Sequence, residues 1–260
     1  MTAVDEATVD LEWQESERGA IARLSYRERR LNLVGSAGLR ALHAAMDQAE
    51  GREDARVVVL SGAGGRAFVG GADIAEMVDL DPPRARRFIS DLHQACDRIR
   101  SSPLPVVARI EGYCLGAGLE LAACCDLRLA ARDARFGMPE VRVGIPSVIE
   151  AALLPRLIGL GRAQDLVLTG RLVDAEEALR IGLVDGVADA GAALEALVDE
   201  RVGELLAGGR RALAAQKELI RRWQELPLSA AIEAGVDAFA RSWETPEPRE
   251  AMRRFLERRR

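Results

Sequence analysis

One stretch of the sequence, residues 105–146, limits the folds open to this chain more than any other. It opens with a β-branched apolar run at 106–110, which is typical of a buried strand. Glycines at 116 and 118 interrupt the run, and residues 119–125 are small and apolar enough to form a buried helix. A helix that starts at such a turn directs unpaired backbone N–H groups toward whatever lies above it. The stretch therefore predicts a site for an anion or an oxyanion.

Two glutamates follow turns within this stretch. Glu120 comes after Gly116-Ala117-Gly118-Leu119, and Glu140 comes after Gly137-Met138-Pro139. A carboxylate a few residues beyond the turn would face the same place as the N–H groups. In an alternative interpretation, Glu120 is a paired structural carboxylate and the glycines only allow close packing; the spacing alone does not separate the two.

The same succession of strand, glycine turn and helix occurs earlier in the chain. Residues 57–60 form a continuous apolar run, typical of a strand buried on both faces, and a turn follows at 61–65. Gly70 and Gly71 then lie between apolar residues and lead to Asp73, a candidate helix N-cap. Strands that alternate with helices in this way predict an α/β fold with mostly parallel strands.

The N-terminal part of the chain predicts a hairpin followed by a helix. Apolar residues alternate at 9–13 and at 20–26, with a turn at 17–19 between them. Ser36 is a candidate cap for the helix, whose apolar residues recur at 39, 42, 46 and 49.

The second half of the sequence is mostly helical. Helical patterns end at Gly170 and at Gly182, a last strand is expected at 183–187, and helix predominates from 191 onward. We therefore divide the chain into an α/β core, residues 1–195, and a C-terminal helical region, residues 196–260. One apolar stripe in this region is typical of a core or subunit contact: Ile232, Val236, Phe239 and Trp243.

Composition argues against several classes of function. The 260 residues carry a net charge of −5, which gives no basic footprint for nucleic acid. No apolar run approaches the roughly 20 residues that a membrane span needs. The four cysteines show no metal-type spacing, and neither His43 nor His93 is near a cysteine or carboxylate cluster in the sequence, so we expect neither a zinc site nor a histidine-based triad. We expect a cytoplasmic, metal-free protein with buried free thiols, whose acid–base chemistry comes from carboxylates.

Five motifs, in order along the chain, resemble the enoyl-CoA hydratase/isomerase family, or crotonase superfamily. FVGGADI at 68–74 and GYCLGAGLELAACCDLRLA at 112–130 resemble the two oxyanion loops of the family. FGMPEVRVGIP at 136–146 resembles its second carboxylate segment. VLTGRLVDAEEALRIGLVDGV at 167–187 and EAMRRFLERR at 250–259 are similar to its later signature and its C-terminal helix. The resemblance covers nearly the whole chain and favours a functional role for both glutamates.

The resemblance implies an architecture and a substrate class. The expected fold is a crotonase-like α/β spiral of repeated β-β-α units, with a C-terminal helical region that builds homotrimers, usually paired into hexamers. The expected partner is an acyl-CoA thioester, and no cofactor is needed because coenzyme A is part of the substrate. Neither nucleic acid nor a membrane is an expected partner, and fatty acid metabolism is the expected setting.

The resemblance also implies roles for individual residues. The backbone N–H groups of Gly70 and Ala117 would form an oxyanion hole for the thioester oxygen. Glu120 would orient and activate a water that adds to C3 of a trans-2-enoyl-CoA, while Glu140 protonates C2 as the general acid. Two nearby carboxylates also tend to split their pKa values, which keeps one of them protonated near neutrality.

Further residues are expected to bind substrate. Arg30, together with Arg29, is a candidate for the adenosine phosphate end of coenzyme A, and a solvated charge run is the alternative interpretation. The other substrate-binding residues that the resemblance implies are Leu31, Phe68, Gly71, Ala72, Asp73, Ile74, Gly116 and Pro139.

One segment departs from the family pattern. Many hydratases carry a glycine-rich segment with Thr-Gln-Arg after the equivalent of Pro146, whereas this chain has SVIEAALLP at 147–155. An ordinary short straight-chain substrate is therefore in question. Glu150 is either a third carboxylate of the acyl pocket, acting on a branched or heteroatom-bearing acyl group, or a structural or interface residue.

Other activities fit the same motifs. An isomerase that moves a double bond needs one main acid–base carboxylate, and Glu140 would serve. A thioester hydrolase would use the same oxyanion hole, with water attacking the carbonyl. Glu120 favours hydration over isomerisation. A non-catalytic or RNA-binding relative is disfavoured because Lys217 is the only lysine in the sequence.

Overall fold

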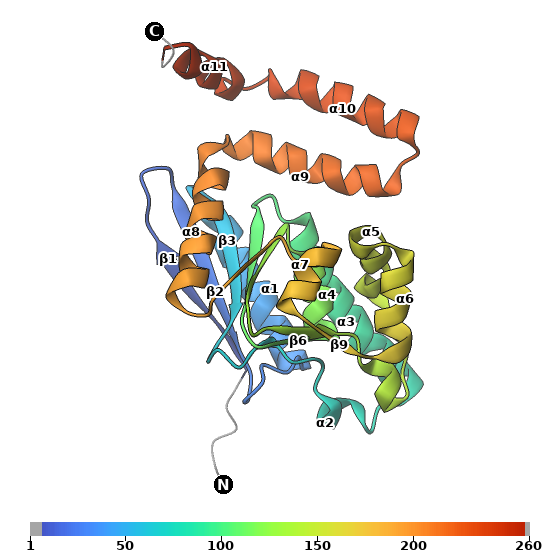
Figure 1. Ribbon diagram of the computed structural model, residues 1–260. Helices are drawn as coiled ribbons and strands as arrows, with labels where there is room; N and C mark the ends of the chain where they lie inside the picture. The colour runs from blue at the N-terminus through green and yellow to red at the C-terminus, as the bar shows by residue number, and fades with distance from the viewer. Residues whose placement is uncertain (1–6, 258–260) are drawn as a thin grey trace.

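The strands of the chain form two sheets of unequal size (Figure 1). The computed structural model describes residues 7–257. The larger sheet has the strand order β1-β2-β3-β5-β7-β10, and the smaller sheet has the order β4-β6-β8-β9. The strands of the larger sheet are β1 (Thr8–Gln14), β2 (Ala20–Arg27), β3 (Ala55–Gly62), β5 (Val106–Ile110), β7 (Leu127–Ala131) and β10 (Gly186–Ala188). The strands of the smaller sheet are β4 (Ala67–Val69), β6 (Tyr113–Leu115), β8 (Arg135–Gly137) and β9 (Leu172–Asp174).

Most of the strands pair in parallel, as the sequence predicted. The hairpin β1–β2 and the pair β8–β9 are antiparallel. The other neighbouring pairs in both sheets are parallel. In the larger sheet β3 and β5 carry apolar residues on both faces, because helices cover both sides.

The chain follows a repeated β-β-α path. Strands β3, β5 and β7 of the larger sheet are each followed by a short strand of the smaller sheet, namely β4, β6 and β8. The first two pairs lead into helices: α2 (Ile74–Met77) with α3 (Pro82–Ser101), and α4 (Ala117–Cys124). The third pair leads into the helical turns η1 (Glu140–Val143) and η2 (Ile149–Leu153), then α5 (Leu154–Ile158) and α6 (Leu160–Thr169). Three-residue strands carry no periodicity of their own, so sequence pattern alone indicated only a strand, a turn and a helix.

Several helix ends follow the signals in the sequence. Asp73 caps α2, with its carboxylate accepting a hydrogen bond from the backbone of the first turn. Gly170 ends α6 and Gly182 ends α7 (Ala175–Ile181), both in the left-handed conformation that glycine adopts without strain.

Two local predictions were wrong in position. Gly35, not Ser36, is the N-cap of α1 (Ser36–Gly51), because the Ser36 hydroxyl bonds to Glu76 of α2 instead of its own helix. The last strand of the larger sheet begins at 186 rather than 183. The Leu183 N–H bonds back to the Ala178 carbonyl and completes the end of α7 before the strand starts.

Helix α8 (Ala192–Ala207) packs on the larger sheet and belongs to the core. Its apolar residues Leu194, Val198 and Val202 contact side chains of the sheet that include Val57 and Val107. The predicted division at residue 195 thus falls inside α8; the separation of a core from a C-terminal region stays a prediction.

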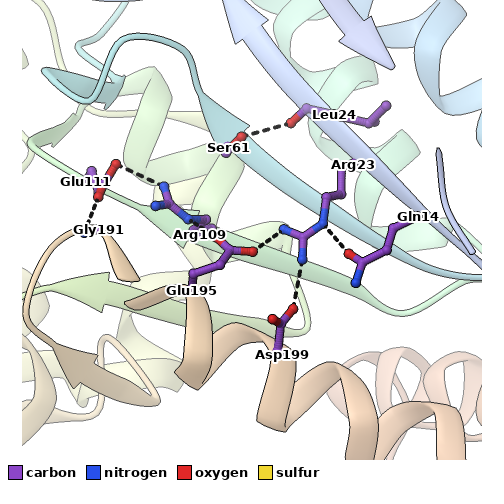
Figure 2. Close-up of polar contacts among 9 residues, drawn as sticks. All are labelled: Gln14, Arg23, Leu24, Ser61, Arg109, Glu111, Gly191, Glu195 and Asp199. Carbon is purple, nitrogen blue, oxygen red and sulfur yellow. Dashed lines mark hydrogen bonds and ion pairs between the residues drawn. The ribbon is translucent and has the colours of Figure 1, made fainter. Parts of the chain in front are cut away.

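Ion pairs fasten α8 to the sheet alongside this apolar contact (Figure 2). The Glu195 carboxylate of α8 lies between two arginines of the sheet, 2.6 Å from Arg23 Nη1 and 2.9 Å from Arg109 Nε. Asp199, one turn further along α8, lies 2.8 Å from Arg23 Nη2. Glu111 accepts from Arg109 and also from the Gly191 N–H that precedes α8. These carboxylates and arginines therefore satisfy one another, which marks the cluster as structural.

Helix α9 (Arg210–Glu225) lies across one end of the core (Figure 1). Lys217 anchors the helix there. The buried Lys217 ammonium lies 2.7 Å from Asp126 Oδ2, and it donates to the carbonyls of Ile99 at 3.1 Å and Leu104 at 3.0 Å. Three donors thus meet three acceptors, which is the condition for burying an ammonium group.

The last two helices lie outside the core. Helix α10 (Leu228–Ser242) runs back along α9, and α11 (Glu247–Glu257) continues toward the C-terminus (Figure 1). Ile232, Val236 and Phe239 of α10 are 58–68% exposed, so this predicted stripe does not enter the core of the chain. A subunit contact is the interpretation that remains for it.

Two further observations concern the described chain as a whole. No helix within residues 7–257 is both long and apolar enough to cross a membrane. All four cysteines are free and buried, as the sequence predicted.

Candidate active site

The two predicted oxyanion loops meet at the N-terminus of α4. A Cβ on Gly118, in the first turn of α4, would overlap the carbonyl oxygen of Val69 at the end of β4. Glycine at this position therefore lets the end of β4 approach α4 closely, which brings Gly70 toward Ala117. Ala117 is the first residue of α4, so its N–H has no acceptor within the helix.

The other predicted oxyanion donor is already engaged. The Gly70 N–H donates to the Leu31 carbonyl at 2.9 Å. An oxygen that binds to Gly70 has to share this N–H with Leu31 or displace the Leu31 carbonyl. The structure thus brings two predicted site residues together, in a contact that the sequence did not suggest.

The side chain of Glu140 lies beside the turn that leads into α4. It starts η1, and its Oε2 accepts a hydrogen bond from the Ser147 hydroxyl at 2.7 Å. Its Oε1 lies so close to Gly116 that an added Cβ would overlap it. Gly116 has φ +50°, a left-handed conformation that favours glycine. The carboxylate is therefore held beside the residue that precedes Ala117.

Glu120 is buried in the first turn of α4. It is 5% exposed, and its Oε1 accepts a hydrogen bond from the Ala151 N–H of η2 at 3.0 Å. Burial raises the pKa of Glu120 to about 8; the bond from Ala151 opposes this rise, and the negative charges of Glu140 and Glu150 add to it. No cation pairs with Glu120 in the part of the chain that the structure describes, which argues against a paired structural carboxylate.

The raised pKa of Glu120 bears on which carboxyl group of the site holds a proton. A pKa of about 8 means that Glu120 is mostly protonated at neutral pH in the free chain. The sequence-based hypothesis makes Glu140 the general acid that protonates C2, and this role stays a prediction.

The remaining predicted substrate-binding residues occupy different environments. Asp73 is buried and forms an ion pair of 2.9 Å with Arg29, while Arg30 is exposed to solvent. Phe68 of β4 is 1% exposed and packs in the hydrophobic core, whereas Ile74 is exposed. The other predicted substrate-binding residues are sequence neighbours of residues already described. Gly71 and Ala72 lie between Gly70 and Asp73, and Pro139 precedes Glu140.

Three contacts of the site were missed in the sequence. They are the Ser147 hydroxyl on Glu140, the Ala151 N–H on Glu120, and the approach of His93 Nδ1 to Glu150 Oε1 at 2.7 Å. His93 lies 57 residues before its partner, so nothing local in the sequence indicated that α3 and η2 pack together. His93 therefore contacts one carboxylate that is distant in the sequence. Among the described residues, no group of three or more His, Cys, Asp or Glu side chains is arranged to hold a metal ion.

The chain is similar to known proteins over most of its length. Residues 16–260 match the sequence model of the enoyl-CoA hydratase/isomerase family. The short-chain-enoyl-CoA hydratase of Clostridium acetobutylicum is 33% identical over 234 residues, which cover 90% of this chain and 89% of that protein. The crotonyl-CoA hydratase of Syntrophomonas wolfei is 37% identical over 204 residues, or 78% of each protein. The crystal structure of an enoyl-CoA hydratase from Bacillus anthracis has a TM-score of 0.90 to this chain at 31% identity, and the match covers 96% of both.

The matches to the family and to these relatives span most of the sequence, and the structural match shows that the spiral of β-β-α units is the crotonase fold. The chain therefore belongs to the enoyl-CoA hydratase/isomerase family.

Proposed function

We propose that this protein hydrates a trans-2-enoyl-CoA thioester to a 3-hydroxyacyl-CoA. The observation that carries the proposal is the placement of Glu120 and Glu140 at the N-terminus of α4, with a pKa of about 8 for Glu120. Two relatives that are named hydratases support the same reaction class. An isomerase needs only one of these carboxylates, so the pair favours hydration.

The oxyanion hole would stabilise the enolate formed from the thioester. The Ala117 N–H supplies one donor, where the helix dipole also favours negative charge. The Gly70 N–H supplies the second donor once its bond to the Leu31 carbonyl opens. A well-placed oxyanion donor generally contributes about 10²–10³ in rate.

One proton shared between the two carboxyl groups serves both directions of the reaction. In hydration, water gives its hydroxyl to C3 and its proton to the Glu120 carboxylate, while Glu140 gives its proton to C2. The pair holds one proton before and after this step. The raised pKa of Glu120 favours the state in which Glu120 holds the proton, which is the starting state for dehydration. Hydration therefore starts from the state in which the proton has moved to Glu140.

The rest of the substrate would follow the segments around the oxyanion loops. Arg30 is exposed and free to meet the adenosine phosphates, whereas Arg29 is held by Asp73. The acyl chain would lie near η2, where the sequence departs from the family pattern. The proposal includes no separate cofactor, because coenzyme A is part of the substrate.

The proposal extends to assembly. The exposed apolar face of α10 favours a homotrimer or a hexamer, since an isolated chain would leave these residues in water. A cytoplasmic location and a role in fatty acid metabolism stay predictions from the sequence.

The test is the loss of enoyl-thioester absorbance with crotonyl-CoA, measured together with thiol release. Loss of absorbance without free thiol is the expected result, and Glu120→Gln and Glu140→Gln are each expected to lower the rate by at least 100-fold. Free thiol would instead indicate thioester hydrolysis. Near-wild-type hydration by either variant would show that the carboxylates do not act as a pair.

A further inference from the structure

Glu150 is a buried carboxylate beside the site that the proposed chemistry leaves unused. It lies in η2 next to Ala151, and its side chain is 8% exposed. Its Oε1 lies 2.7 Å from His93 Nδ1. Its Oε2 is buried and has no hydrogen-bond partner among residues 7–257. Burial within the chain argues against an interface residue, and an unpaired buried oxygen costs free energy that a purely structural role would not require.

Glu150 and Glu120 occupy the same small region between three elements. Helical turn η2 packs against both α3 and α4. His93 lies one turn before Cys96 on α3, and the Cys96 thiol is influenced by Cys124, one turn after Glu120 on α4. The residue that follows Glu150 donates its backbone N–H to Glu120. The backbone of η2 at the residue after Glu150 is therefore in direct contact with Glu120.

We propose that Glu150, held in place by His93, is a positioning residue that acts on Glu120. The contact with His93 fixes η2, so that the Ala151 N–H stays directed at Glu120 Oε1. The negative charge of Glu150 then favours the protonated form of Glu120 in an interior where charges are poorly screened. This inference rests on the proposed function, because it concerns the group that exchanges a proton with water.

The other groups around Glu120 do not mask the effect of the Glu150 charge on the pKa of Glu120. Glu140 faces Glu120 from η1, and it is the only other carboxylate among the charged neighbours that influence Glu120. The interaction with Cys124, together with burial, raises the pKa of the Cys96 thiol on α3, and burial raises the pKa of the Cys114 thiol on β6. These thiols are therefore neutral at the pH values of interest, and β4 presents the apolar Val69 to α4.

The first test measures the pKa of Glu120 without any substrate. The unfolding midpoint is measured as a function of pH for the wild-type protein and for each variant named below, once with Glu120 and once with Glu120→Gln. The difference between the two pH curves of a pair reports the titration of Glu120. Glu150→Gln and Glu150→Met both remove the charge, so either one gives the answer if the other folds poorly. Each is expected to lower the pKa of Glu120 by about 0.5–1 unit, whereas Glu204→Gln, which removes an exposed charge from α8, is expected to leave it unchanged. An unchanged pKa in the Glu150 variants would overturn the proposal.

The second test concerns His93. His93→Leu removes the donor to Glu150 and is expected to lower kcat about tenfold with little change in KM. His93→Gln retains an N–H donor and is expected to recover most of the activity. Equal losses in both variants would count against a positioning role for the histidine. If the wild-type protein does not hydrate crotonyl-CoA, the proposed function fails, but the substrate-free pKa measurement still decides whether Glu150 acts on Glu120.

Discussion

The carboxylate of Glu140 lies against the backbone of Gly116, so that a methyl group on Gly116 would overlap Oε1. This contact ties the second carboxylate to the turn that presents the Ala117 N–H. The acid–base group and the oxyanion donor therefore keep a fixed relation to each other.

Replacement of Gly116 by alanine should separate the two. The new Cβ displaces the Glu140 carboxylate and strains a backbone at φ +50°. We expect kcat/KM for the enoyl-CoA substrate to fall about 100-fold in Gly116→Ala, while the protein stays folded. Gly64→Ala is the matched control, because Gly64 has φ +80° with open space around it. A comparable loss in the control would mean that backbone strain, not displacement of Glu140, explains the effect.

The raised pKa of Glu120 predicts a pH-dependent stability. The folded chain holds a proton on Glu120 up to about pH 8, whereas the unfolded chain releases it near pH 4.5. Because the folded state binds more protons in this window, stability falls as the pH rises from about 4.5 to 8. Relative to Glu120→Gln, the wild-type protein should lose about 3–5 kcal/mol of unfolding free energy across the window. Denaturant titrations of both proteins at fixed concentration measure this, and parallel pH curves would show that Glu120 is not protonated in the folded state.

Much of the fold could be predicted because local sequence patterns determine many of its strands and helix ends. The hairpin β1–β2, the buried strands β3 and β5, and the caps at Asp73, Gly170 and Gly182 all follow from alternation, apolar runs and turn residues. The smaller sheet could not be predicted from pattern, since strands of three residues have no periodicity. It was expected only from the family resemblance.

The sequence predicted which residues would lie near one another at the candidate site, but it did not predict their hydrogen-bond partners. Motif order placed Glu120, Glu140 and Ala117 together. The hydrogen bonds on the carboxylates of this region come from distant segments. Ala151 lies 31 residues after Glu120, and His93 lies 57 residues before Glu150. Likewise, the Gly70 N–H is bonded to Leu31 in a loop that no local signal connects to it. Such contacts depend on how helices pack, which a single sequence does not specify.

The placement of Arg30 predicts a selective effect on substrate binding. Arg30→Ala should raise the KM for crotonyl-CoA about 5–10-fold, because a charge-assisted contact with a phosphate is lost. The KM for a crotonyl thioester of pantetheine, which lacks the adenosine phosphates, should not change. Steady-state kinetics with both substrates checks this. Equal effects on the two substrates would place Arg30 away from the adenosine end.

The exposed apolar face of α10 predicts that a single charge can prevent assembly. Val236→Asp places a carboxylate in the middle of the face formed by Ile232, Val236 and Phe239, and it should convert a trimer or hexamer into monomers. Gln216→Asp adds the same charge at an exposed position on α9 and should leave assembly unchanged. Sedimentation velocity distinguishes the species. Full assembly of Val236→Asp would exclude this face as the subunit contact.

Lys217 predicts a large loss of stability on substitution. Lys217→Met leaves the carbonyls of Ile99 and Leu104 without their donor and removes the partner of Asp126. We expect the free energy of unfolding to fall by about 3 kcal/mol. Adding Asp126→Asn should recover part of this loss, which chemical denaturation can measure. A loss below about 1 kcal/mol would mean that α9 is held by apolar contact alone.

The burial of Lys217 also has a chemical consequence. It is the only lysine in the sequence, and in the folded chain its ammonium is enclosed by three oxygen acceptors. Acylating reagents and lysine-modifying enzymes therefore find no lysine amine on the surface of the native protein. The rate at which Lys217 becomes labelled would measure how often α9 detaches from the core, so this chain carries its own reporter of opening.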